Sequence, residues 1–212
     1  MIKSYTLNVW QLIVAGGVMM WPIALCSVVA LSIAAEKIAY FLSIQINSRE
    51  FLSVLLEKMK RHQIKEALES CDKSKSPLSN ILKAGILKYD RSRPQIKEAI
   101  EDASLYEIPK LEKNLDTLAT IAHICPLLGL MGTVLGMIKV FYGLQAKTEA
   151  MYPVLQGEVA QGIWEALLTT VAGLMVGTLS FVAYNYFVSR VNKFILEMET
   201  MATEFVNFLT EQ

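Results

Sequence analysis

The sequence predicts an all-α membrane protein with three transmembrane helices and one large charged helical block between the first two. Three runs contain no charged residue: Asn8 to Ala35, Ile121 to Ile138, and Ala166 to Ser189. Each is near or above the length of about 20 residues at which a helix crosses a bilayer. The block from 36 to 120 instead contains 15 Lys and Arg residues and 13 Asp and Glu residues. This contrast predicts a polytopic protein whose long helices extend from the membrane into the cytoplasm.

The distribution of basic residues near the membrane ends predicts the orientation. Lys37, Arg49, Lys110, Lys113, Arg190 and Lys193 fall on one side, and Lys3 and Lys147 on the other. The side richer in Lys and Arg is normally cytoplasmic, so the N-terminus is expected in the periplasm and the C-terminus in the cytoplasm. The expected segments are an outer N-terminus at 1–11, transmembrane helix 1 at 12–35, a cytoplasmic helical region at 36–120, transmembrane helix 2 at 121–143, an outer loop at 144–157, transmembrane helix 3 at 158–188 and a cytoplasmic C-terminal helix at 189–212.

The first span is predicted to be an anchor that stays in the mature protein. The apolar block from Val9 to Ala35 is too long for the apolar core of a cleaved signal peptide. Trp10 and Trp21 are expected near the outer interface, where indole rings gather. Pro22 is a candidate kink.

The cytoplasmic region is predicted to fold into short helices. Asn47 or Ser48 can cap a helix whose apolar stripe is Phe51, Leu52, Leu55, Leu56 and Met59. A second helix covers about 63–71, and a third starts at Pro77 and runs through Tyr89. Pro94 is expected at another helix N-terminus, where its missing N–H costs nothing.

From Pro94 onward the pattern predicts one long helix that enters the membrane, which Pro109 and Pro126 bend without ending. Its stripe steps by four and three, as in a packed helix seam. The stripe is Leu111, Leu115, Leu118, Ala122, Cys125, Gly129, Gly132 and Gly136. The third span carries a similar face, Ala166, Thr170, Gly173, Gly177 and Ser180, and residues 189–212 continue it as an amphipathic helix. Because small residues allow membrane helices to approach closely, Gly129, Gly132, Gly136, Gly173 and Gly177 are predicted to serve helix packing.

Three side chains in the spans are candidates for a functional role. Thr133 and Thr170 can line a pore, because a hydroxyl both donates and accepts hydrogen bonds. A threonine in a membrane helix also bonds its own backbone, so packing is the simpler explanation from composition alone. Glu165 precedes the uncharged run of the third span. It either faces a bundle interior or water, as membrane carboxylates do, or lies close enough to the outer interface to stay hydrated. Lys139 is expected to extend its ammonium toward the outer interface.

Other kinds of site are not indicated. The three cysteines, Cys26, Cys71 and Cys125, are scattered and odd in number, which favours neither a disulfide framework nor a metal centre. The basic residues of 36–120 alternate with acids, which argues against nucleic-acid binding. No phosphate-binding loop or nucleophile–base pair is present in the sequence, so neither an enzyme nor a cofactor is predicted.

Two motifs resemble those of a known family. Residues 118–122 together with Pro126-Leu-Leu-Gly-Leu-Met-Gly-Thr-Val-Leu-Gly-Met-Ile138 resemble the second-span motif of the MotA/TolQ/ExbB proton-channel family. Gly162-Ile-Trp-Glu-Ala-Leu-Leu-Thr-Thr-Val-Ala-Gly-Leu174 resembles its third-span motif, with Tyr184-Asn185 and Glu36-Lys37 as further matches. Three spans resemble ExbB and TolQ more than the four-span MotA, although the segment before the first span is shorter than in many ExbB proteins.

The resemblance implies a subunit of an inner-membrane motor driven by the proton gradient. It implies a homo-pentameric ring around single-span helices of an ExbD- or TolR-like partner, with a TonB- or TolA-like protein as a further partner and lipids around the ring. It also implies that Thr133, Thr170 and Glu165 line the proton pathway. The motor is thereby expected to energise an outer-membrane or envelope process such as TonB-dependent import, although the resemblance does not tell which one. The family pattern of two threonines and one glutamate favours protons as the coupling ion and does not exclude sodium.

Two rival functions remain at this point. A secondary transporter with its own substrate would show an internal repeat and broken helices around a midplane site, which three spans without a repeat do not provide. A structural membrane scaffold would use Thr133, Thr170 and Glu165 only for packing.

Overall fold

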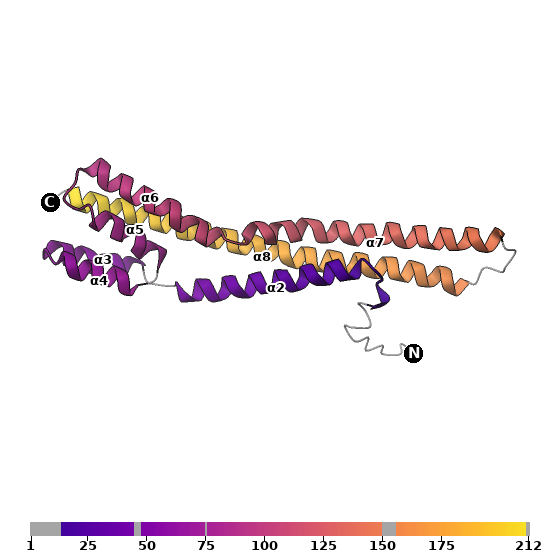
Figure 1. Cartoon of the computed structure of the whole chain (residues 1–212). Coiled ribbons are helices and arrows are strands. Elements are labelled where there is room, and N and C mark those ends of the chain that lie inside the picture. The colour runs from indigo at the N-terminus through magenta and orange to yellow at the C-terminus, as the bar shows by residue number, and fades with distance from the viewer. Residues whose placement is uncertain (1–13, 45–47, 75, 150–155, 211–212) are drawn as a thin grey trace. The chain divides into compact units, whose positions relative to one another are not determined.

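The computed structural model describes residues 14–44, 48–74, 76–149 and 156–210, and every long regular element in these ranges is a helix. The helices are α2 (Met20–Ser43), α3 (Ser48–Lys60), α4 (Ile64–Lys73), α5 (Pro77–Ile86), α6 (Arg93–Glu112), α7 (Leu115–Glu149) and α8 (Gln156–Thr210) (Figure 1). Three of them, α2, α7 and α8, contain stretches long and apolar enough to cross a membrane. The predicted all-α class with three membrane helices is therefore confirmed.

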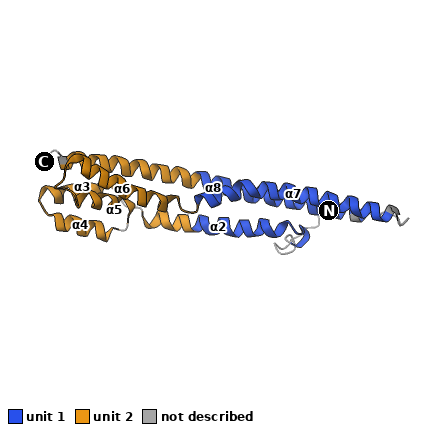
Figure 2. Ribbon diagram, turned by 45° about the horizontal axis from the view of Figure 1, so that its top comes forward, with its two compact units in different colours: residues 1–35, 115–185 blue, residues 36–114, 186–212 orange. Residues whose placement is uncertain are grey.

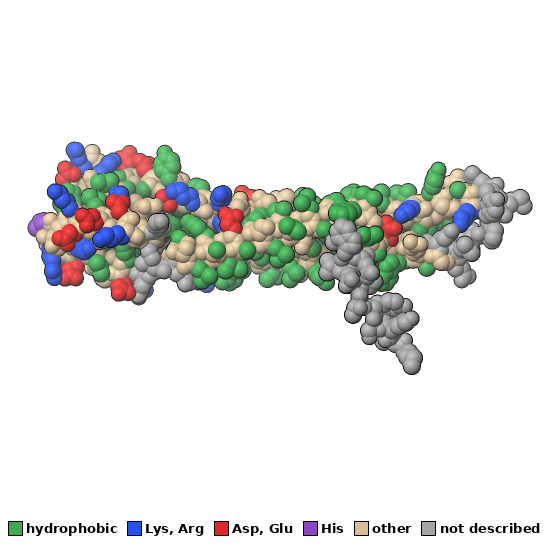
Figure 3. Space-filling model, turned by 60° about the horizontal axis from the view of Figure 1, so that its bottom comes forward, with side chains coloured by type: hydrophobic (Ala, Val, Ile, Leu, Met, Phe, Trp, Pro, Cys, Tyr) green, Lys and Arg blue, Asp and Glu red, His purple; other side chains and the backbone are tan. Residues whose placement is uncertain are grey.

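The chain divides into two compact units. Unit 1 consists of residues 1–35 and 115–185, and unit 2 consists of residues 36–114 and 186–212 (Figure 2). In the space-filling view, hydrophobic side chains cover much of the visible face of unit 1, whereas charged side chains gather over unit 2 (Figure 3). The two units carry the two compositions that the sequence shows, an apolar one and a charged one. Where the membrane begins and ends along the helices stays a prediction.

Unit 2 contains the short helices predicted from the charged block. In α3, Leu52, Leu55 and Met59 are buried, as the apolar stripe requires. The helices α4 and α5 begin within a residue of their predicted starts, and α5 ends at Ile86, before Tyr89. Consecutive helices from α3 to α6 pack on one another. The core of unit 2 includes Leu82, Ile86 and Phe205, each of which is fully buried.

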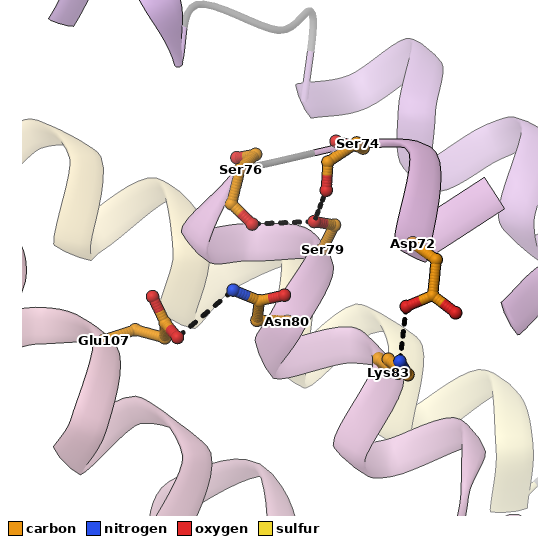
Figure 4. Close-up of polar contacts among 7 residues, drawn as sticks. All are labelled: Asp72, Ser74, Ser76, Ser79, Asn80, Lys83 and Glu107. Carbon is orange, nitrogen blue, oxygen red and sulfur yellow. Dashed lines mark hydrogen bonds and ion pairs between the residues drawn. The ribbon is translucent and has the colours of Figure 1, made fainter. Parts of the chain in front are cut away.

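Polar contacts join the ends of these short helices. The Ser79 hydroxyl donates to the carbonyl oxygens of Ser74, at 2.6 Å, and Ser76, at 2.7 Å, where the chain turns into α5. At the next residue, Asn80 Nδ2 donates to Glu107 Oε1 at 3.1 Å and so links α5 to α6 (Figure 4). Lys83 of α5 forms an ion pair with Asp72 of α4.

The C-terminal part of α8 belongs to unit 2 and packs on its helices. Phe205 is fully buried, and its ring lies against the α5 glycine Gly85. Lys60 of α3 places its Nζ 5.6 Å from the ring centre of Phe208. The predicted amphipathic continuation of the third span is thus present as an uninterrupted helix, because α8 runs from Gln156 to Thr210.

The prediction of one unbroken helix from Pro94 into the membrane is wrong. The helix α6 ends at Glu112, and α7 begins at Leu115. Between them, Asn114 has φ of 64°, the left-handed conformation that asparagine tolerates better than most residues at a helix end. Pro109 and Pro126 lie inside helices, as predicted, so the break does not occur at a proline.

The first two residues after the first span hold this break in place. Lys37 is 3% exposed, and its Nζ donates to the carbonyl oxygen of Leu111 at 2.6 Å, in the last turn of α6. Asn114 Nδ2 donates to Glu36 Oε2 at 2.9 Å. The Glu36-Lys37 pair therefore caps the C-terminal end of α6 and anchors the residue that ends it.

In unit 1, α2 begins with a turn instead of the predicted kink. Residues 14 and 15 are helical, a turn follows, and α2 starts at Met20. Pro22 lies in the first turn of α2, where a missing N–H is harmless, so it does not kink the helix. Trp10, the start of the predicted first span and residues 150–155 of the predicted outer loop at 144–157 lie outside the described residues. The part of that loop up to Glu149 is helical, as the end of α7.

Candidate functional site

The membrane part of α7 packs antiparallel against α8 along the two small-residue stripes. Gly129 faces Thr170, Gly132 faces Thr169, and Gly136 faces Ala166, so the contacts run in opposite directions along the two helices. The large members of the α7 stripe are also buried, with Leu118 and Cys125 at 0% exposure. The structure therefore places the two stripes that the sequence singled out in one seam.

The glycines of the seam have no room for a side chain. A Cβ built on Gly136 would lie 2.8 Å from the Cβ of Ala166, and one built on Gly129 would lie 3.1 Å from the Cα of Thr170. A Cβ on Gly173 would lie 2.5 Å from the carbonyl oxygen of Cys125. Two of these three neighbours are backbone atoms, which cannot move aside as the end of a flexible side chain can. The close approach of the two helices thus depends on the glycines.

Thr170 bridges the seam. Its hydroxyl donates to the carbonyl oxygen of Gly129 on α7 at 3.0 Å and also lies 3.4 Å from the carbonyl oxygen of Ala166 on its own helix. Its side chain is partly buried. A hydroxyl with this geometry uses its proton on a carbonyl and keeps its oxygen lone pairs available as acceptors.

Sequence analysis missed Thr169, the residue beside Thr170. Thr169 is 1% exposed, and its hydroxyl donates to the carbonyl oxygen of Ala166 at 2.8 Å. A Cβ on Gly132 would overlap the Thr169 side chain. The buried position in the α8 stripe is therefore Thr169, and Thr170 lies at the edge of the seam. A step of three from Ala166 fits the helical period as well as the predicted step of four.

Thr133 lies on α7 between Gly129, which contacts Thr170 of α8, and Lys139, which contacts Glu165 of α8. Its hydroxyl donates to the carbonyl oxygen of Leu130, one turn earlier in the same helix, at 2.6 Å. The structure thus brings Thr170 to Gly129 and Glu165 to Lys139, with Thr133 between them along α7, but it satisfies the Thr133 hydroxyl within its own helix.

Glu165 forms an ion pair across the seam that the sequence did not predict. Its Oε2 lies 3.2 Å from Nζ of Lys139, and its side chain is 23% exposed, against 72% for Lys139. Lys139 therefore directs its ammonium to Glu165, and its extension toward the outer interface stays a prediction. The pairing depends on the register of α7 against α8, which no local pattern encodes.

A shallow hollow opens beside this ion pair at the same end of the seam. Its volume is about 200 Å³, and its lining includes Lys139, Lys147, Gln161, Gly162 and Glu165. Its other lining residues are Val140, Gly143, Leu144 and Val159. A hollow of this size holds a few water molecules, since each takes about 30 Å³ in the liquid. Hydroxyls, a half-buried carboxylate and room for water are the parts from which a proton pathway through a membrane is built.

Comparisons with known proteins show the family of the chain. The model of the MotA/TolQ/ExbB proton channel family matches residues 73–200. The chain is 30% identical over 195 residues to a biopolymer transport protein ExbB homologue of Methanothermobacter thermautotrophicus, covering 91% of this chain and 67% of that protein.

Two further relatives are bacterial. The chain is 30% identical over 164 residues to the biopolymer transport protein exbB1 of Vibrio cholerae, covering 76% of this chain and 70% of that protein. It is 34% identical over 141 residues to the Tol-Pal system protein TolQ of Pseudomonas aeruginosa, covering 61% of this chain and 59% of that protein.

Three membrane-length helices, two of which pack along a glycine seam, define a helical membrane protein. The family model covers more than half of the chain, and so this chain belongs to the MotA/TolQ/ExbB proton channel family.

Proposed function

We propose that this chain is the ring-forming subunit of an inner-membrane motor that is driven by the proton gradient. The observation that carries the proposal is Glu165, a carboxylate in α8 that is only 23% exposed and lies on the same helix as Thr170. A carboxylate within a membrane helix costs about 2.5–3.5 kcal/mol on insertion scales, and such residues normally serve ion or proton pathways. Thr133, Thr170 and Glu165 are the proposed lining of that pathway.

The exposed faces of α7 and α8 support assembly into a ring. Leu127, Leu130 and Val134 of α7 are each more than half exposed, and Leu167 and Val171 of α8 are similarly exposed. The seam is used for packing within one chain, and these exposed apolar faces are available to contact lipid and further copies of the chain. The family membership points to five copies around single-span helices of an ExbD- or TolR-like partner, with the N-terminus in the periplasm and the C-terminus in the cytoplasm.

The proposed mechanism transfers protons along hydroxyls, water and carboxylates. The partner's own membrane carboxylate would take up and release protons as it meets Thr133, Thr170 and Glu165 of successive subunits. Each proton that crosses releases about 2.3 kcal/mol per 100 mV of membrane potential. A TonB- or TolA-like protein would pass this work to an envelope process such as TonB-dependent import.

A structural scaffold is the second candidate function, and one observation favours it. The hydroxyls of Thr133 and Thr170 both donate to backbone carbonyl oxygens, at 2.6 and 3.0 Å, as threonines with a packing role do. Under this alternative Glu165 and Lys139 join two helices and carry no ion.

The intact mass of the complex distinguishes these functions. The complex is extracted gently from its native membrane through a tag on this chain, and every component is identified by mass spectrometry. The motor proposal predicts five copies of this chain with a small single-span protein that carries a membrane aspartate. A stable monomer or dimer with no such partner, seen across several detergents, would refute the motor and leave the scaffold.

A further inference from the structure

Two aromatic side chains on α8 stand one bilayer thickness apart. Trp164, which is 55% exposed, lies near the start of α8, and Tyr184 follows 20 residues later on the same helix. At about 1.5 Å of rise per residue, the two lie roughly 30 Å apart along the helix axis. This is the thickness of the hydrocarbon core of a bilayer, and Trp and Tyr gather at its two surfaces. No charged residue occurs from Ala166 to Tyr184, so this stretch of α8 fits the core.

A charged residue of α7 lies at the level of Trp164. Across the seam, Gly136 of α7 faces Ala166 of α8, and the two helices run in opposite directions. Lys139, three residues after Gly136, is therefore level with residue 163, which precedes Trp164. The side chain of Lys139 is 72% exposed. Because charged side chains avoid the hydrocarbon core, Lys139 marks the same outer boundary independently of Trp164.

The inner boundary is marked on α7 as well. Gly129 of α7 faces Thr170 of α8. Asp116 lies 13 residues before Gly129, and Tyr184 lies 14 residues after Thr170. Nearly equal steps in opposite directions from one contact bring Asp116 and Tyr184 to the same level. No charged residue occurs between Asp116 and Lys139, so α7 and α8 give the same two boundaries from different kinds of residue.

The first span reaches the outer boundary too. The backbone of Gly17, in the turn before α2, lies so close to the Glu165 carboxylate that a Cβ built on Gly17 would overlap it. Glu165 is the residue after Trp164, so this turn lies at the outer boundary. Trp21 follows in the first turn of α2 and is 56% exposed. Exposed indole rings of two helices therefore stand near the same end of unit 1.

We propose that Trp21 and Trp164 contact the outer headgroup layer of a bilayer whose hydrocarbon core covers α8 from Trp164 to Tyr184. Indole rings suit this layer because their apolar body enters the acyl chains while the N–H end stays in polar surroundings. Glu165 and the hollow beside it then form the outer mouth of the pathway, where periplasmic water reaches the carboxylate. Thr170 lies five residues further along α8, about 8 Å deeper in the membrane. The assignment of this mouth rests on the proposed function.

Beyond this boundary, both α7 and α8 leave the hydrocarbon core. The helix α7 continues for ten residues past Lys139 to Glu149, and α8 begins at Gln156, eight residues before Trp164. Helical segments of these lengths extend about 12–15 Å. The headgroup layer takes up about 5–8 Å on each side of the core, so both segments pass through it and end in water.

Depth-dependent quenching of tryptophan fluorescence tests this placement without reference to motor activity. The chain has three tryptophans, Trp10, Trp21 and Trp164, and each of the last two is kept alone by changing the others to phenylalanine. The complex with its native components is placed in phosphatidylcholine liposomes. Their acyl chains carry bromine either near the headgroup end or near the terminal methyl group. A complex in which all three tryptophans are phenylalanine supplies the background from the partner proteins, which is subtracted.

Trp21 and Trp164 are each expected at about 15 Å from the bilayer centre, so bromine near the headgroups should quench both more strongly than bromine near the methyl ends. The matched control is Leu174→Trp in the chain without other tryptophans. Leu174 is on the same helix, 50% exposed, and about 15 Å deeper than Trp164, so its order of quenching should be reversed. Met175→Trp, at another exposed position, replaces this control if the first variant fails to assemble.

Two outcomes would overturn the inference. Stronger quenching of Trp164 by bromine near the methyl ends would place this part of α8 inside the core. Quenching of Trp164 by neither lipid would mean that protein, such as a neighbouring copy of the chain, covers the indole ring in place of lipid.

Failure of the proposed function has a different mark. A complex whose tryptophans lie at the expected depths but which carries no protons across a liposome membrane would refute the motor and leave the position of the bilayer standing. Proton flux in a complex whose Trp164 lies deep in the core would do the reverse.

Discussion

Thr170 donates a hydrogen bond across a helix seam to the backbone carbonyl of Gly129, 3.0 Å away. The bond is possible because residue 129 has no side chain, so that the two helices approach until a threonine hydroxyl reaches the opposite backbone. Packing and polar chemistry thus depend on the same close contact. Substitutions can test the packing and the hydrogen bond separately, because the loss of each costs a different amount of free energy.

Replacement of Thr170 by valine is predicted to stop proton-coupled work while leaving the complex assembled. An interhelical hydrogen bond in a membrane is worth about 0.6 kcal/mol on average, too little for its loss to dismantle the helix pair. Proton flux into liposomes that contain the purified complex should fall to the background rate. Thr170→Ser should restore it, since serine keeps the hydroxyl.

The matched control for Thr170→Val is Thr178→Val, at an exposed position of the same helix. It should conduct and assemble like the wild type. If Thr170→Val conducts as well as Thr178→Val does, the hydroxyl of Thr170 has no part in the pathway.

Gly173→Val is predicted to push α7 and α8 apart. The new Cβ would meet the carbonyl oxygen of Cys125 at 2.5 Å and the Cα of Gly129 at 2.9 Å, and backbone atoms cannot turn aside. Overpacking of this kind costs about 1–3 kcal/mol. The thermal midpoint of the detergent-extracted protein should fall. Gly143→Ala, where a new Cβ meets nothing within 4 Å, should not lower it. Equal midpoints for the two variants would contradict the close seam.

Lys37→Met is predicted to loosen the junction between α6 and α7. The substitution leaves the buried carbonyl oxygen of Leu111 without the donor that now lies 2.6 Å away. A buried polar group that loses its partner costs about 1–3 kcal/mol. Hydrogen exchange of the amides at residues 111–116 should become faster, whereas Lys97→Met, at a lysine whose side chain is 68% exposed, should leave it unchanged. Unaltered exchange in Lys37→Met would show that the junction holds without this cap.

The thiol of Cys71 is predicted to make the stability of unit 2 depend on pH in the alkaline range. Burial, and after it the charge of Asp72, raises the pKa of Cys71 from 9.0 to about 11. The folded state therefore holds the proton more tightly than the unfolded state does. This contribution is fully present below pH 9 and is lost as the pH rises toward 11.

Thermal unfolding at a series of pH values checks this expectation. Between pH 9 and 11 the midpoint of the wild type should fall more steeply than that of Cys71→Ala, in which no thiol titrates. Parallel curves would mean that Cys71 titrates alike in the folded and unfolded states. At pH 8 the folded wild type should also react slowly with iodoacetamide at Cys71, because the thiolate is the reactive form.

The periodicity of apolar and small residues along the sequence was enough to predict the helices and their buried faces. The stripe from Leu115 to Gly136 is buried in the seam because a step of three and four residues along one helix is a local property of the sequence. The short helices of unit 2 were predictable for the same reason, with Pro77 and Pro94 marking their starts.

Features that depend on two segments at once were not predictable. The pair of Lys139 and Glu165 requires the register of α7 against α8, and the contact of Gly17 with Glu165 requires a turn that no apolar pattern marks. The break at Asn114 did leave a signal, since asparagine is the residue after glycine that most readily ends a helix in the left-handed conformation. This signal for a helix end is weaker than the stripe on either side of it, which predicts a continuous helix.

Proton flux through the complex with Glu165 altered is the most direct test of the central claim that this carboxylate lies on a proton pathway. The complex, purified with all its native components, is placed in liposomes that hold a pH-sensitive dye, and a potassium diffusion potential supplies the driving force. Flux is expected in the wild type, partial flux in Glu165→Asp, and only the background rate of empty liposomes in Glu165→Gln, with the mass of the complex unchanged. Wild-type flux in an intact Glu165→Gln complex would contradict the account, because protons would then cross without this carboxylate.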